Sequence, residues 1–100
     1  MIEEEKIKDL VENYSVGTET VMNFCDILFS YPIVRNEDES LFYECLEAAI
    51  SAKSSGAFLQ DSNRKIDDNY IAEKCLYRIY SEDAIPYLSN RFKEENGIED

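Results

Sequence analysis

The chain of 100 residues is 44% hydrophobic and 12% aromatic, which predicts a single folded domain over residues 1–100 and argues against an acidic disordered tail. Its 22 acidic and 10 basic residues give a net charge of −12, so we expect no direct nucleic-acid partner and no contact with a membrane surface, both of which are anionic. Histidine is absent, which removes the commonest general acid or base and the usual activator of a nucleophile, so we expect no catalytic residues.

Two amphipathic helices are predicted in the first third of the chain. Apolar residues recur every three or four positions between about Glu3 and Tyr14, which predicts the first helix. A second helix is expected with Thr18 as its N-cap and its end near Ser30 or Tyr31, and its apolar stripe is broad enough for a central, largely buried position. Pro32 should end this helix, and a short charged link is expected over residues 33–36.

Three further helices complete the prediction. The third is expected from about Asp38 to Lys53, followed by a polar loop over residues 57–65. A fourth helix should end near Tyr80, and a fifth, shorter helix should use Ile85, Leu88 and Phe92. Asp67, Asp68 and Asn69 are alternative caps for the fourth helix. The expected fold is an all-α antiparallel bundle of four to five helices joined by short loops.

The third predicted helix combines a buried face with an acidic face. At about 100° per residue, Glu37, Ser40, Glu44 and Glu47 form one stripe, roughly opposite an apolar stripe. Arg35 is the one basic residue between Asp9 and Ala52, so lysines do not alternate with these acids. Unpaired carboxylates repel one another, which favours a basic partner, although a merely solvated acidic face is the alternative.

Tyrosine rings would add buried apolar surface to an interface of this kind. Tyr43 is expected on the outward side beside Ser40 and Glu47, where a ring among carboxylates suits protein binding. Tyr70 and Tyr77 lie seven residues apart on the fourth predicted helix. They would form either a second exposed aromatic edge or part of the core.

No metal or cofactor site is predicted. Cys25, Cys45 and Cys75 lie on apolar helix faces without any CxxC pair, so we expect small buried side chains in a reducing, cytoplasmic location. The N-terminal residues also lack the features of a secretory signal. Asp67 with Asp68, or Glu44 with Glu47, are the only acid pairs that could act catalytically or hold Mg²⁺, and acids at a helix start are more often caps.

Several segments of the chain resemble a known family. These are IKDLVENY, TETVMNFCDIL, LFYECLEAAISA at residues 41–52 and RKIDDNYIAEKCLYRIY at residues 64–80. Over about Ile7 to Tyr80 they resemble the colicin D immunity proteins and the related immunity proteins of contact-dependent growth inhibition systems. The resemblance implies a small all-α protein that binds a tRNA-cleaving toxin domain and blocks its basic cleft with carboxylates. In that family the acids that block the toxin lie on and just after the helix that begins with the Leu-Phe pair. The resemblance therefore points first to Glu47 and second to Asp61, in the following loop, as toxin-blocking residues.

Charge pattern and resemblance lead to one leading hypothesis, an inhibitor of a cognate basic nuclease toxin domain. Its predicted toxin-binding residues are Glu37, Asp38, Tyr43, Glu44, Glu47, Asp61, Asp67 and Asp68. The alternative is a phage-type acidic nucleic-acid mimic that inhibits a restriction or RNA-guided nuclease, for which acids should spread along an extended surface. A small adaptor without inhibitory activity is a third possibility.

Overall fold

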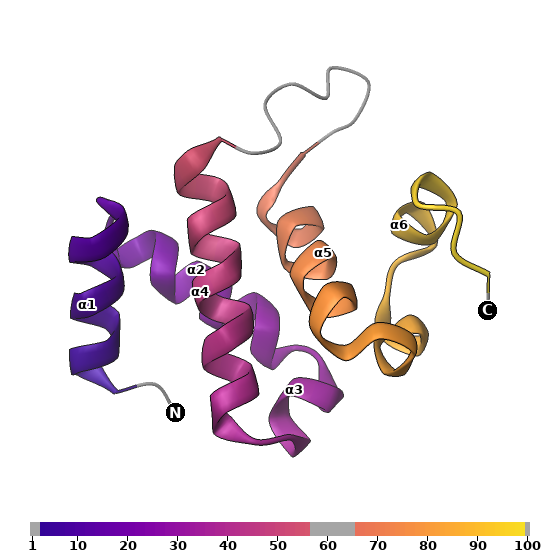
Figure 1. Cartoon of the computed structure of the whole chain (residues 1–100), viewed down its shortest axis with the longest axis horizontal. Helices are drawn as coiled ribbons and strands as arrows, with labels where there is room; N and C mark the ends of the chain where they lie inside the picture. The colour runs from indigo at the N-terminus through magenta and orange to yellow at the C-terminus, as the bar shows by residue number, and fades with distance from the viewer. Residues whose placement is uncertain (1–2, 57–65, 100) are drawn as a thin grey trace.

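The computed structural model describes residues 3–56 and 66–99, and within these residues every regular element is helical (Figure 1). The elements are α1 (Glu4–Tyr14), α2 (Thr18–Phe29), α3 (Pro32–Asn36), α4 (Glu39–Ser55), α5 (Asp68–Tyr80), the 3₁₀ helix η1 (Ser81–Tyr87) and α6 (Asn90–Glu95). The expected all-α fold is therefore confirmed, with more and shorter helices than the four or five predicted.

Side-chain caps start the two longest helices, and a glycine ends the longer one. The Asp38 carboxylate accepts a hydrogen bond from the Ser40 backbone N–H at 2.9 Å and starts α4. Gly56 ends α4 with a φ of 68°, a left-handed conformation that costs glycine little. Among the alternative caps of α5, Asp67 takes the position, and its carboxylate accepts from the Tyr70 N–H at 2.8 Å.

Helix α4 lies at the centre of the molecule, between α1 and α5, and also packs on α2 (Figure 1). The end of α4 meets the start of α5 through Lys53 and Asp68, so these two helices run antiparallel. In contrast, α1 and α4 run in the same direction, because Glu3 bonds Tyr43 near their starts and Tyr14 bonds Ser54 near their ends. The intervening α2 and α3 make this parallel arrangement possible.

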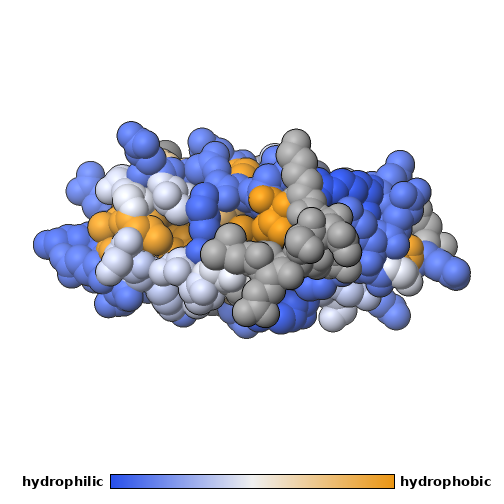
Figure 2. Space-filling view, turned by 90° about the horizontal axis from the view of Figure 1, so that it is seen from above, coloured by the Kyte–Doolittle hydropathy of each residue, from blue (hydrophilic) through white to orange (hydrophobic). Residues whose placement is uncertain are grey.

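The core is shared by α2, α4, α5 and the C-terminal segment. Its largest fully buried side chains are Phe24, Phe92, Leu28, Leu46, Ile50, Leu76, Val21 and Cys45. The molecule is a slab of 39 × 33 × 16 Å. From above, hydrophobic residues lie along the middle of this slab and are bordered by hydrophilic ones (Figure 2). Since neighbours cover α4 on several sides, only a narrow strip of it reaches solvent.

Two segments differ from the prediction. The expected link over residues 33–36 is entirely helical, because Pro32 both follows the end of α2 and occupies the first turn of α3, where its missing N–H costs nothing. The expected fifth helix is divided in two. Leu88 is extended (φ −81°, ψ 149°), and the Ser89 hydroxyl starts α6 by accepting from the Phe92 N–H at 3.1 Å.

Candidate functional site

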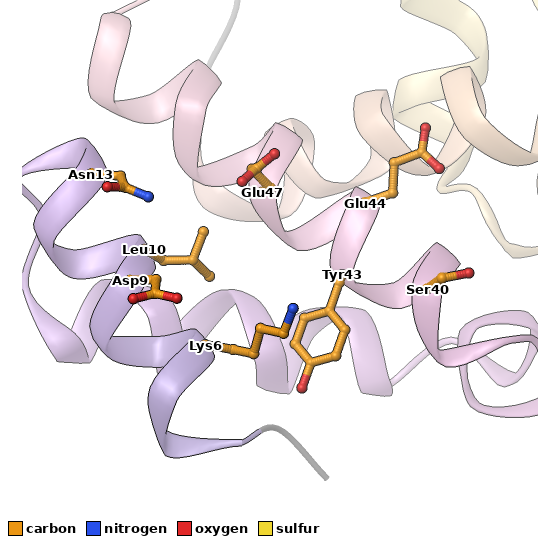
Figure 3. Close-up of a pocket in the computed structure, with 8 residues that line it drawn as sticks. All are labelled: Lys6, Asp9, Leu10, Asn13, Ser40, Tyr43, Glu44 and Glu47. Atoms are coloured by element: carbon orange, nitrogen blue, oxygen red, sulfur yellow. The ribbon is translucent and has the colours of Figure 1, made fainter.

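A groove with a volume of about 400 Å³ lies between α1 and α4 (Figure 3). Its lining comes from four residues of each helix: Lys6, Asp9, Leu10, Asn13, Ser40, Tyr43, Glu44 and Glu47. Leu10 is buried and points from α1 toward α4, with Asp9 and Glu47 on the two helices near it, whereas Glu44 points away from α1 (Figure 3). We refer to these eight residues as the α1/α4 groove.

The carboxylates of the groove are exposed. Asp9 extends from α1, and Glu44 and Glu47 extend from α4, whose apolar face is committed to the core. Among the residues that the structure describes, none makes a hydrogen bond or ion pair with these three carboxylates. Arg35, the nearest basic residue in sequence to the acidic stripe, donates to the Phe29 carbonyl instead. The predicted display of Glu44 and Glu47 on one face is therefore present, and Asp9 of α1 adds to it.

Tyr43 is held more firmly than its predicted outward position implied. Its side chain is half-buried, its hydroxyl accepts a hydrogen bond from the Glu3 N–H at 3.1 Å, and its ring contacts Phe42 at 5.2 Å between centroids. The Lys6 ammonium lies 5.2 Å from the centroid of the Tyr43 ring. The reason for the difference is that α1 packs beside α4, which the pattern of a single helix cannot indicate. Tyr43 thus forms part of the wall of the groove.

The groove continues toward the start of α4. A second hollow of about 350 Å³ shares Lys6, Ser40 and Tyr43 with it and adds Glu3, Asp38 and Glu39. Hydrogen bonds from the Ser40 backbone and hydroxyl lower the pKa of Asp38, so this carboxylate stays ionised in mildly acidic solution. Glu37 is also exposed, but it lines a separate hollow with Arg35 and Glu39.

Asp67 and Asp68 have structural partners and lie apart from the groove. Asp68 accepts from the Lys53 ammonium at 2.7 Å and from the Asn23 amide at 2.6 Å. Asp67 caps α5 and lies 3.9 Å from the Arg91 guanidinium. Their cap and ion-pair contacts explain both residues without a partner protein. Asp61, the remaining predicted toxin-binding residue, lies outside the described residues.

The tyrosines of α5 do not form an exposed edge. Tyr70 is only 3% exposed, and its ring lies 5.2 Å from that of Phe92, so the core alternative is correct for it. Tyr77 is half-buried and lies 6.3 Å from the same phenylalanine. The Tyr70 ring therefore stabilises the attachment of α6.

Glu73 is a buried acid that the sequence analysis did not identify. It is 8% exposed, and its Oε2 accepts from the Ser89 hydroxyl at 3.0 Å and from the Ser89 N–H at 3.4 Å. Burial raises the pKa of Glu73, and the hydrogen bonds from Ser89 offset part of that effect. The sequence does indicate that Glu73 is buried, because it lies three residues before Leu76 and seven before Tyr80, on the apolar face of α5.

The cysteine side chains are shielded from solvent. All three cysteines are free and buried, as predicted. Burial raises the thiol pKa to about 11 for Cys25 and about 12 for Cys45, and it also raises that of Cys75, so the reactive thiolate is scarce at neutral pH. No group of three potential metal ligands occurs in residues 3–56 and 66–99. None of the helices in these ranges is long and apolar enough to span a membrane.

Comparison of the chain with protein-family models, curated proteins and solved structures finds no match.

Proposed function

We propose that this chain is an immunity protein that inhibits a bacterial tRNase toxin domain by placing the α1/α4 groove against the toxin's basic active-site cleft. The observation that carries the proposal is the set of Asp9, Glu44 and Glu47, three exposed carboxylates around one groove that have no ion-pair partner in residues 3–56 and 66–99. The segments that resemble the colicin D-type immunity family support the same function.

The physical reason lies in the toxin's substrate. A nuclease must keep a cationic cleft to bind the phosphates of its RNA, and this cleft attracts carboxylates equally well. Steered association of oppositely charged proteins reaches about 10⁸ to 10⁹ M⁻¹s⁻¹ at low salt. An acidic inhibitor therefore competes directly with tRNA and needs no chemical step. Its site of action is the cytoplasm, where tRNA is found.

The residues assigned to the interface are those that line the α1/α4 groove and the hollows beside it. Tyr43, Glu44 and Glu47 form the centre with Asp9, while Asp38 and Glu37 extend the acidic surface toward the start of α4. Asp67 and Asp68 are left out because their carboxylates cap α5 and pair with cations of the same chain.

The test uses two variants with the same charge. Glu44→Lys/Glu47→Lys changes the groove, and Glu82→Lys/Asp83→Lys changes exposed acids of η1; each raises the net charge by four, from −12 to −8. The assay is protection of tRNA from a tRNase toxin domain, with the product of the reading frame immediately upstream as the first candidate. The groove variant should lose protection and the η1 variant should keep it.

Equal protection by both variants would reject the groove as the inhibitory surface. If the chain protects no RNA from the upstream domain and inhibits a restriction or RNA-guided nuclease instead, the acidic mimic replaces the immunity function.

A further inference from the structure

Lys6 occupies an unusual position for a cation in an acidic groove. It extends from α1 toward α4, and its ammonium lies over the Tyr43 ring, 5.2 Å from the centroid (Figure 3). Within the described residues it forms no ion pair, although Asp9, Glu44 and Glu47 line the same groove. The face of the Tyr43 ring is therefore a place where this groove already holds a cation.

The groove remains under-neutralised with Lys6 present. Three carboxylates line the groove against one ammonium, although Glu44 points away from α1, and the hydroxyl of Ser40 and the amide oxygen of Asn13 add further hydrogen-bond acceptors. The volume of about 400 Å³ lies toward the small end of ligand pockets, which hold roughly 300 to 1,000 Å³. This space suits one long side chain better than a whole helix.

An arginine side chain matches these features better than a lysine does. Its guanidinium is planar, stacks on an aromatic face and donates up to five hydrogen bonds, two of them in parallel to one carboxylate. An ammonium can meet either the ring or a carboxylate closely, as Lys6 does with the ring. A guanidinium on the ring keeps N–H groups at its edge for carboxylates on both helices.

Building on the proposed function, we propose that the α1/α4 groove is a receptor for one arginine of the basic partner, and that this arginine displaces Lys6 from the Tyr43 ring. The incoming guanidinium lies on the ring between Asp9 of α1 and Glu47 of α4, and Glu44 adds negative charge at the margin of the groove. Lys6 has a flexible stem and an exposed position, so it moves into solvent without disturbing the fold. Lys6 is thus an internal competitor that the partner must replace.

The first test removes the competitor. Lys6→Gln should bind the partner more tightly than Lys8→Gln by roughly 2- to 5-fold, the value of an exposed cation–π contact. Lys8 is the matched control because it is an exposed lysine of α1 outside the groove, so both variants change the long-range charge equally. Equal affinities of the two variants would contradict displacement of Lys6.

The second test examines the ring. Tyr43→Phe keeps the aromatic face and loses only the hydroxyl that accepts from Glu3, whereas Tyr43→Leu loses the face. Partner binding should be weakened less by Tyr43→Phe than by Tyr43→Leu. In the Tyr43→Leu background, Lys6→Gln should no longer differ from Lys8→Gln. A difference that persists without the ring would overturn the assignment of Lys6 to the ring.

The third test needs no toxin. The isotope-labelled protein is titrated by NMR with N-acetyl-Gly-Arg-Gly-amide and with its lysine and citrulline analogues. The arginine peptide should shift the amide signals of the groove at lower concentration than the lysine peptide, and the neutral citrulline peptide should have no effect. Equal, diffuse shifts from the arginine and lysine peptides would overturn the inference. The contrast between the groove and η1 variants in tRNA protection is independent of this result, so the proposed function can survive failure of the inference.

Discussion

Replacing Phe92 with alanine should release the last helix without unfolding the rest of the protein. Phe92 is 1% exposed and packs on Tyr70 and Tyr77 of α5 at 5.2 and 6.3 Å between ring centroids. Truncation of a buried phenylalanine costs about 3 to 5 kcal/mol, and loss of an aromatic pair accounts for about 0.5 to 1.5 kcal/mol of such a value. With six residues, α6 is far shorter than the roughly 12 to 15 residues that an isolated helix needs.

Hydrogen exchange separates this local effect from global unfolding. In Phe92→Ala the amides of α6 should lose protection by the equivalent of several kcal/mol, while those of α2 and α4 change less. Phe24→Ala is the matched control, because Phe24 is fully buried at the centre of α2 and its truncation should lower protection throughout the chain. Uniform loss of protection in both variants would refute the view that Phe92 acts as a local anchor.

Three other predictions concern buried and paired groups. Because burial raises the native pKa of Glu73 above its unfolded value, the native state binds this proton more tightly, and the ionised carboxylate lowers stability at neutral pH. Urea unfolding should therefore show Glu73→Gln more stable than wild type at pH 7, with an advantage that shrinks as the pH falls through the raised pKa toward the unfolded value of about 4.3; an advantage independent of pH would contradict this. Asp68→Asn should cost only about 0.2 to 1 kcal/mol in thermal unfolding, since Lys53 and Asp68 are partly exposed, and it should leave tRNA protection unchanged, whereas lost protection would restore Asp68 to the interface. Cys25 and Cys45 should react with a thiol reagent only on unfolding, and fast labelling of the native protein would show that they are accessible.

The sequence predicted the features that depend on local periodicity. The apolar stripes gave the main helices, and the outward phase of Glu44 and Glu47 followed from the buried phase of Cys45 and Leu46. Features that depend on neighbouring helices were not predictable in this way. Asp9 and Lys6 join the groove because α1 runs beside α4 in the same direction, an arrangement that neither helix encodes alone.

Local capping effects explain why the helix boundaries differ from the predicted ones. Pro32 both follows one helix and starts another, and a pattern search records only the first of these effects. Similarly, the hydroxyl of Ser89 caps α6 and interrupts a predicted continuous helix. Asp67 and Asp68 also act locally. Asp67 caps the start of α5, and Asp68 forms an ion pair with Lys53.

The central claim is that the carboxylates of the α1/α4 groove, and not the overall negative charge, direct this protein to its partner. The most direct measurement is the association rate with the toxin domain that the chain protects tRNA against, across a range of ionic strengths. Relative to Glu82→Lys/Asp83→Lys, the variant Glu44→Lys/Glu47→Lys should associate at least about tenfold more slowly at low salt and with a shallower salt dependence. Matching rates and salt slopes for these two equally charged variants would contradict the account.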